Sequence, residues 1–136
     1  MKASIARIQA AHAVLQQIGE QEEVPVRGRY RIYQLSREFM QVLEAADQLR
    51  DQLLEEFAEK DQDGQPKYIS TEDGGVEVTL TDPVAFRERI AELMSTEEEV
   101  EGQPLRASEL GEAIAKISPA QLVTLGPFFE WDEEPR

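Results

Sequence analysis

The feature that most constrains the fold is an uninterrupted run, residues 29–57, that contains neither glycine nor proline. Apolar residues recur in it at steps of three and four, the spacing of one face of an α-helix. They are Ile32, Leu35, Phe39, Val42, Ala46, Leu49, Leu53 and Phe57. We therefore predict a helix of about 30 residues, which at roughly 1.5 Å per residue is about 45 Å long. We expect Phe39, Leu49, Leu53 and Phe57 in the core or at an oligomer interface.

A shorter helix is predicted at the N-terminus, over residues 2–18. Its apolar stripe consists of Ile5, Ile8, Leu15 and Ile18, and Gly19 is a suitable residue to end it. We expect this helix to pack antiparallel against the long helix. It is too short to cover the whole of the long apolar stripe, so another element has to cover the C-terminal half.

The best candidate for that cover is a third helix over residues 82–96. Asp82 is placed to cap it, and Pro83 suits its first turn. The apolar stripe of this segment is Phe86, Ile90, Leu93 and Met94. If the third helix does not cover the long one, a second chain is expected to do so.

A β-hairpin is predicted between the long helix and the third one. Residues 67–71 and 76–80 flank the turn Glu72-Asp73-Gly74-Gly75, which is rich in residues that tolerate positive φ. Val76, Val78 and Leu80 alternate with polar residues, so one face should pack on the helices while the other faces water. The stretch 102–106 is interpreted as a short strand or extended arm that joins the hairpin.

The C-terminal part is expected to form a small helical cap. Two short helices are predicted, over residues 109–117 and 119–125, and the second has Ser118 as cap, Pro119 in its first position and Gln121 in its third. With the hairpin, these elements predict an α+β fold. A length of 136 residues fits a single acidic domain over residues 1–136.

The net charge of −14 is extreme for this length and is unevenly distributed. Residues 1–60 hold 8 Lys or Arg against 10 Asp or Glu, net −2, whereas residues 61–136 hold 6 against 18, net −12. Such a chain repels nucleic acids and anionic membranes. We therefore predict protein partners, with no nucleic acid bound directly and no membrane. Residues 1–7 also lack the apolar segment of a signal peptide.

The residue types that usually carry catalysis are scarce. There is no cysteine, which excludes disulfides, thiol catalysis and Cys-ligated metals. His12 is the only histidine and lies on the apolar stripe of the first helix, where a core or interface role is expected. No nucleophile elbow, Gly-rich phosphate loop or His-Glu-x-x-His motif occurs. We predict a non-enzymatic protein without catalytic residues, cofactor or metal.

One segment partly resembles a calcium loop. Asp61-Gln62-Asp63-Gly64 begins like one, and Glu72 stands at the twelfth position. The fifth and sixth positions, however, are Gln65 and Pro66 instead of an oxygen donor and glycine. We interpret the segment as a polar turn, and cation binding by Asp61 and Asp63 stays open.

Arginines near the start of the long helix form a basic patch that is predicted to contact a partner. The contact candidates are Arg27, Arg29 and Arg31, with Arg37 one to two turns further along. Because the chain is so acidic, an ion-pairing role toward its own acids or an acidic neighbouring subunit is favoured over nucleic-acid binding.

A second group of contact candidates is aromatic. Phe128, Phe129 and Trp131 precede the acidic residues 132–134, which are also contact candidates. The rings are interpreted either as closure of the core or as a segment that docks into a groove on a partner.

The order of segments resembles a family of small, largely uncharacterised proteins encoded by tailed bacteriophages and prophages. The resemblance covers about residues 24–101 and lies in Val24-Pro25-Val26-Arg27-Gly28-Arg29-Tyr30 at the start of a long helix, Leu53-Leu54-Glu55-Glu56-Phe57 at its end and Glu59-Lys60-Asp61-Gln62-Asp63-Gly64 as the polar turn. Phe86, Ile90, Leu93 and Met94, followed by Glu99-Val100-Glu101, continue it. The resemblance implies a phage origin and a non-enzymatic protein.

Two functions are consistent with this resemblance. The first is a virion structural or assembly accessory component of the head, neck or tail, which acts by packing and charge complementarity and can form a homo-oligomer. The second is a host-takeover factor that inhibits a host machine, such as RNA polymerase or a nuclease, through its acidic surface. Either function places the protein in the virion or the host cytoplasm.

Overall fold

The computed structural model describes residues 1–132 and divides the chain into two compact units. The first unit combines Met1–Glu44 with the chain from Ser95 onward, and the second unit is Ala45–Met94. The predicted long helix is α2, Val26–Phe57, and it belongs to both units because their boundary falls inside it. The α+β fold class is confirmed. The single domain expected over residues 1–136 is divided into these two units.

The first unit begins with a strand that the sequence pattern did not indicate. Lys2–Ser4 form β1, which pairs antiparallel with β4, Glu97–Glu99. The N-terminal helix α1 is Ile5–Gly19, and the Ser4 side chain caps it by accepting a hydrogen bond from the backbone N–H of Arg7 at 3.2 Å. The predicted start at residue 2 was too early, because side-chain spacing does not reveal a partner strand far along the chain.

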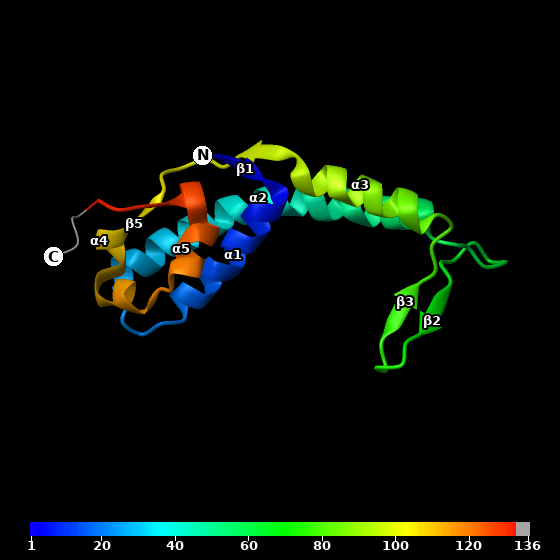
Figure 1. The fold of residues 1–136 in the computed structure, drawn as a ribbon, viewed down its shortest axis with the longest axis horizontal. Helices are drawn as coiled ribbons and strands as arrows, with labels where there is room; N and C mark the ends of the chain where they lie inside the picture. Colours follow the sequence, from blue (N-terminus) through cyan, green and yellow to red (C-terminus); the bar gives the residue numbers. More distant parts are fainter. Residues whose placement is uncertain (133–136) are drawn as a thin grey trace. The chain divides into compact units, whose positions relative to one another are not determined.

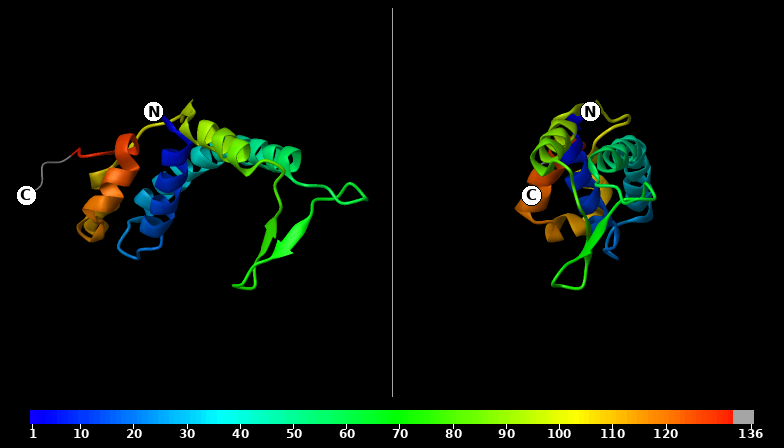
Figure 2. Two further views of the ribbon diagram at one scale, coloured as in Figure 1. Left: turned by 45° about the vertical axis from the view of Figure 1, so that its right-hand side comes forward. Right: turned by 90° about the vertical axis from the view of Figure 1, so that its right-hand side faces the viewer.

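The core of the first unit lies among α1, the N-terminal half of α2 and α5, Pro119–Leu125 (Figure 1, Figure 2). Phe39 of α2 is fully buried, and its ring lies edge-on to Phe128 with the centroids 4.7 Å apart. His12 of α1 packs its ring edge-on against Phe39 at 6.2 Å, which is the predicted core or interface role. The other large side chains that are fully buried are Ile8, Leu15, Ile18, Val100, Leu105, Leu110 and Leu125.

The predicted C-terminal helical cap is present in shorter pieces. Residues 109–117 are divided between α4, Ala107–Leu110, and the 3-10 helix η1, Gly111–Lys116, because Gly111 turns to a φ of 56° that favours glycine. The capping box of α5 is confirmed: the Ser118 hydroxyl accepts from the N–H of Gln121 at 3.1 Å, and the Gln121 side chain accepts from the N–H of Ser118 at 2.9 Å.

The chain beyond α5 returns to the middle of the first unit. After the 3-10 helix η2, Gly126–Phe128, the residues Phe129–Glu130 form β6, which pairs parallel with β5, Leu105–Arg106. The stretch predicted to join the hairpin therefore pairs with the C-terminal segment instead. Leu105 is fully buried in the core of the first unit, and this burial places β5 in that unit, apart from the hairpin.

Gly28 allows α2 and α4 to come into backbone contact. A Cβ atom at Gly28 would lie 2.1 Å from the carbonyl oxygen of Glu109 and 3.1 Å from Cγ1 of Val24. No real Cβ atom tolerates the first of these distances, so only glycine permits this helix crossing. The glycine thus determines how closely the segment 107–110 approaches the start of α2.

The second unit contains the C-terminal half of α2 and the predicted third helix, α3, Pro83–Ser95. Asp82 caps α3 by accepting from the N–H of Ala85 at 3.1 Å. The two helices run alongside each other (Figure 1), and the rings of Phe57 and Phe86 meet edge-on at 6.0 Å. Ala46 and Ala58 are the buried apolar residues of this unit, whereas Leu49 is 43% exposed. The third helix therefore covers the end of α2 only in part.

The predicted hairpin is formed by β2, Tyr68–Ser70, and β3, Val76–Val78, in antiparallel register. The prediction that one face packs on the helices is wrong for its outer part, since Val76 is 65% exposed. The physical reason is that the hairpin runs away from the α2 and α3 helices (Figure 1, Figure 2), so of its large apolar residues only Val78 and Leu80 near its base are half-buried.

Candidate protein-interaction surface

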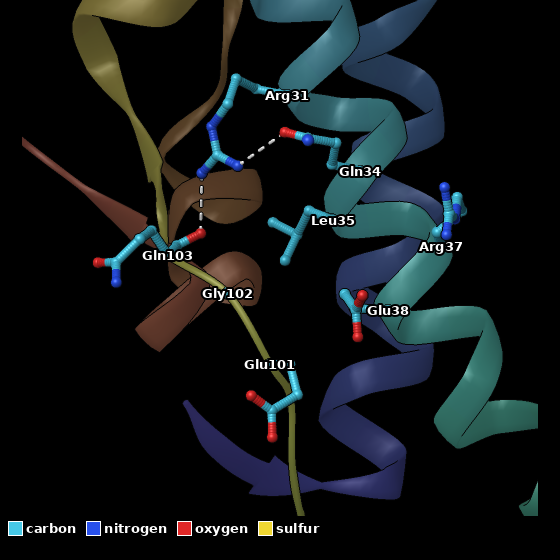
Figure 3. Close-up of a pocket in the computed structure, with 8 residues that line it drawn as sticks. All are labelled: Arg31, Gln34, Leu35, Arg37, Glu38, Glu101, Gly102 and Gln103. Atoms are coloured by element: carbon cyan, nitrogen blue, oxygen red, sulfur yellow. Dashed lines mark hydrogen bonds between the residues drawn. The ribbon is translucent and has the colours of Figure 1, made fainter.

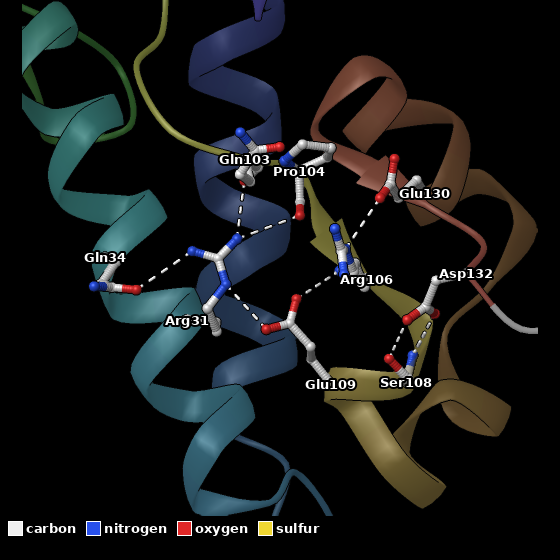
Figure 4. Close-up of polar contacts among 9 residues, drawn as sticks. All are labelled: Arg31, Gln34, Gln103, Pro104, Arg106, Ser108, Glu109, Glu130 and Asp132. Atoms are coloured by element: carbon white, nitrogen blue, oxygen red, sulfur yellow. Dashed lines mark hydrogen bonds and ion pairs between the residues drawn. The ribbon is translucent and has the colours of Figure 1, made fainter.

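Arg31 of the predicted basic patch is engaged within the first unit. Its Nε donates to Glu109 Oε2 at 3.0 Å, and its terminal nitrogens donate to the Gln34 side chain and to the carbonyls of Gln103 and Pro104 at 3.0–3.3 Å (Figure 4). The Arg31 side chain is 23% exposed and that of Glu109 11% exposed. Of the two roles predicted for the basic patch, Arg31 has the first, an ion pair with an acid of its own chain, in segment 103–109.

Arg29 is also engaged, toward the loop before α2. It donates to the carbonyls of Val24 and Glu22 at 3.2 Å each and to that of Gln21 at 3.5 Å. Arg29 therefore satisfies carbonyls of the link that joins α1 to α2. Within residues 1–132 its Nη1 makes no hydrogen bond and no acid pairs with it, so its charge is not neutralised.

Arg27 and Arg37 differ from these two arginines. Both are exposed, and within residues 1–132 neither makes an ion pair or a side-chain hydrogen bond. They are the free cations of the predicted patch in the described part of the chain. Their charges remain available to an acidic partner.

An exposed, largely apolar stripe on α2 includes Arg37 and lies next to Arg27. Its members, at steps of 4, 3, 4 and 3, are Val26, Tyr30, Tyr33, Arg37 and Met40, and together with Arg27 we call them the Tyr–Arg face. The four apolar members are 84%, 61%, 62% and 57% exposed in that order. The steps place the stripe on the side of α2 opposite the buried residues Ile32, Leu35 and Phe39. This part of α2 is therefore apolar on two sides, of which one is covered.

The predicted aromatic group is divided between core and surface. Phe128 is fully buried against Phe39, so its ring closes the core and has no surface for a partner. Phe129 is half-buried, and its ring meets that of Trp131 edge-on at 5.3 Å. Trp131 is 55% exposed and remains accessible.

Two acidic residues near the end of the described chain, Glu130 and Asp132, bind the segment that contains Arg106 and Ser108. Arg106 Nε donates to Glu130 Oε1 at 3.2 Å, and the N–H of Ser108 donates to Asp132 Oδ1 at 3.0 Å (Figure 4). The hydrogen bonds from the Ser108 hydroxyl and backbone, together with the charge of Arg106, lower the pKa of Asp132 below its usual value. The predicted contact acids Glu133 and Glu134 lie outside the described residues.

Two surface depressions adjoin Arg31 and Gln103 on the first unit. One, of about 220 Å³, lies between α2 and the chain at 101–103 and is lined by both signs of charge and by Leu35 (Figure 3). The other, of about 380 Å³, is lined by Arg27, Arg31, Arg106 and Glu109 among others. Arg31 and Glu109 pair with each other beside the second depression, whereas Arg37, Glu38 and Glu101 of the first make no ion pair within residues 1–132.

The calcium-like segment is explained by backbone hydrogen bonds. Asp61 Oδ1 accepts from the N–H groups of Asp63 and Gln65 at 2.9 Å each, an arrangement typical of a turn. Across residues 1–132, no three His, Cys, Asp or Glu side chains gather in a group that could hold a metal ion.

Sequence reasoning missed the Tyr–Arg face, although a signal for it exists. The steps from Val26 to Met40 have the same period as the buried stripe, but tyrosine and arginine did not count as members of an apolar pattern. The structure shows that α2 buries the stripe of Ile32, Leu35 and Phe39, which leaves the stripe from Val26 to Met40 exposed.

A comparison of the chain with protein-family models, curated proteins and solved structures found no match. No helix within residues 1–132 is both long enough and apolar enough to cross a membrane.

Proposed function

We propose that this chain is a non-enzymatic bacteriophage protein that acts by binding other proteins, as a virion structural or assembly accessory component of the head, neck or tail. The observation that carries the binding role is the Tyr–Arg face of α2, where four large apolar side chains are more than half exposed beside two unpaired arginines. The resemblance to proteins of tailed phages over residues 24–101 supports the phage setting.

The composition of the Tyr–Arg face favours a protein partner. Tyrosine, methionine and arginine are enriched in protein–protein interfaces, and tyrosine and arginine dominate the residues whose truncation weakens binding most. A fully covered tyrosine buries about 150–250 Å². Because Tyr30 and Tyr33 are 61% and 62% exposed, a partner that covers them gains most of that area.

The charge distribution favours an acidic protein surface as the partner. Residues 24–37 contain four arginines and no acid, although the whole chain has a net charge of −14. An acidic surface is attracted to this segment, whereas a nucleic acid meets the strongly negative remainder of the chain. We expect such partners in the virion or the host cytoplasm.

Quantitative mass spectrometry of purified particles tests this function. A virion component is expected at a fixed copy number per particle. The double variant Arg27→Glu/Arg37→Glu should be depleted from particles, because both free cations become like charges toward an acidic partner. The control Arg87→Glu removes one exposed arginine on α3 and should be incorporated normally. Absence of the folded wild-type protein from particles contradicts the virion role.

The host-takeover role is a second candidate, favoured by the excess of 28 Asp and Glu over 14 Lys and Arg and by the exposure of Glu97–Glu99. It predicts co-purification with one host complex at low ionic strength and release in moderate salt, since exposed charges are screened. Failure to retain any host complex at low salt contradicts this role.

A further inference from the structure

The hairpin of the second unit carries large apolar residues that nothing in that unit covers. Tyr68, Ile69 and Val76 are 61%, 53% and 65% exposed. In the antiparallel register Tyr68 stands opposite Val78 and Ser70 opposite Val76, so Tyr68, Val76 and Val78 share one face of the sheet. Within the described residues, β2 and β3 pair with each other, and the chain at 57–60 pairs only with residues beside their base, such as Leu80 with Ala58. The hairpin is therefore an exposed element with an apolar face.

The charge around this apolar face is negative. Residues 59–80 contain six acids and two lysines, net −4. Hydrogen bonds from the Thr71 hydroxyl and the N–H of Gly75 hold the Asp73 carboxylate in the turn. By contrast, residues 24–40, which contain the Tyr–Arg face, hold four arginines and one acid, net +3, and one of these arginines, Arg31, is paired with Glu109. The hairpin and the Tyr–Arg face are thus two exposed apolar surfaces of opposite charge.

We propose that the hairpin of one copy of this chain docks on the Tyr–Arg face of a second copy. The inference rests on the proposed function, in that the Tyr–Arg face is a protein-interaction surface, and it names the partner. The apolar face of Tyr68 and Val76 covers Tyr30 and Tyr33, and the acids of the hairpin lie near Arg27 and Arg37. Face-to-face pairing of two Tyr–Arg faces is disfavoured because each of them is cationic.

The contact joins two different surfaces, so it is heterologous. Each copy in an assembly then has one occupied hairpin and one occupied Tyr–Arg face. Such an interface forms a ring if the rotation between copies closes and an open filament if it does not. Either form is a repeating arrangement of copies, as a structural component of a particle requires.

Sedimentation velocity over a concentration series in low salt tests the docking. Wild-type protein is expected to associate reversibly, and moderate salt should weaken the association because the charges are exposed. The face variant Arg27→Glu/Arg37→Glu and the hairpin variant Tyr68→Ala/Val76→Ala should each weaken it by about tenfold or more. The first reverses the charge of one surface, and the second truncates the apolar face of the other. The control Arg87→Glu should associate like wild type. All variants are expected to remain folded because every substituted side chain is exposed, and circular dichroism checks this.

Mixing the two variants gives the sharpest result. The face variant keeps an intact hairpin, and the hairpin variant keeps an intact Tyr–Arg face. Their mixture should therefore form dimers that grow no further, at concentrations where each weakened variant alone is monomeric. A mixture that stays monomeric while wild type associates overturns the heterologous contact.

A wild-type protein that is monomeric at all concentrations overturns self-docking altogether. The proposed function is tested separately by the particle experiment, in which depletion of the face variant from particles still supports it. Conversely, wild-type self-association that survives both variants shows that another surface joins the copies and overturns the inference.

Discussion

The two compact units use the same helix in different ways. In the first unit, α2 buries Ile32, Leu35 and Phe39 under α1 and the C-terminal segments. In the second unit, the same apolar spacing continues, yet Leu53 and Phe57 are only half-buried and Leu49 is exposed. The difference teaches that periodicity shows where a helix can bury side chains, whereas the number of covering elements decides how far they are buried.

The unequal burial predicts unequal stability. Burial of apolar area is the main favourable term in folding, so the first unit should hold most of the free energy of unfolding. The second unit, with Ala46 and Ala58 as its buried apolar residues, should open at lower denaturant concentration.

The largest expected effect comes from truncating the two phenylalanines of α2. Phe39→Ala should lower the free energy of unfolding by about 3–5 kcal/mol, because it leaves a cavity in a closed core. Phe57→Ala should cost about 1 kcal/mol, since its ring is already partly in water. Urea unfolding followed by circular dichroism measures both. Equal losses would contradict the division into a well-packed and a loosely packed unit.

The second prediction concerns the close crossing of α2 and α4. Gly28→Ala should destabilise the first unit by about 1–3 kcal/mol, because the new Cβ forces the backbone at Glu109 to move. The matched control is Gly19→Ala, whose Cβ would meet Ile32 at an ordinary 3.6 Å. The control should be neutral or slightly stabilising by the helix propensity of alanine. Thermal unfolding measures the stability of both variants. If Gly28→Ala were as stable as wild type, α2 and α4 could move apart at this crossing without cost.

The third prediction compares an ion pair from each unit. Arg31→Ala should cost about 1.5–3 kcal/mol, because it leaves the partly buried Glu109 and two carbonyls without their donor. Arg89, whose Nη1 lies 4.0 Å from Glu92 one turn away on α3, is 63% exposed. Arg89→Ala should therefore change stability by less than about 0.5 kcal/mol. Chemical unfolding measures the pair of variants, and similar values would mean that segment 103–109 needs no Arg31.

The smallest effect is a pH dependence of two exposed carboxylates. The Thr71 hydroxyl and the N–H of Gly75 lower the pKa of Asp73, in the second unit, below 3.8. Ser108 and Arg106 do the same for Asp132 in the first unit. Because both folded pKa values are depressed, the stabilisation is present above the unfolded pKa and is lost as the pH falls through the folded one.

Carboxyl NMR titration checks these two values directly. Asp73 and Asp132 should both titrate below 3.8, and Thr71→Val should return the pKa of Asp73 toward that value without moving Asp132. A pKa for Asp73 that does not respond to Thr71→Val would show that the turn hydrogen bond is not formed in solution.

Sequence reasoning located most of the elements because their signals are local. The long helix, the third helix, the hairpin and the capping box at Ser118 and Gln121 depend on residues a few positions apart. The pairings of β1 with β4 and of β5 with β6 were missed, because these two- and three-residue strands have partners far along the chain. For the candidate site, Arg27 was identified, but Arg29 and Arg31 were not distinguished from it.

What the sequence determined by itself was the place of the longer helices, the caps at Asp82 and Ser118 and the concentration of positive charge at the start of α2. What only the tertiary structure decided was which side of α2 is covered and which arginines remain free. Arg31 became an internal contact because Glu109 lies 3.0 Å from it, and that distance depends on the backbone crossing at Gly28. The physical reason is range: hydrogen bonds within a helix join residues four apart, whereas burial and ion pairing depend on which distant segments the fold brings together.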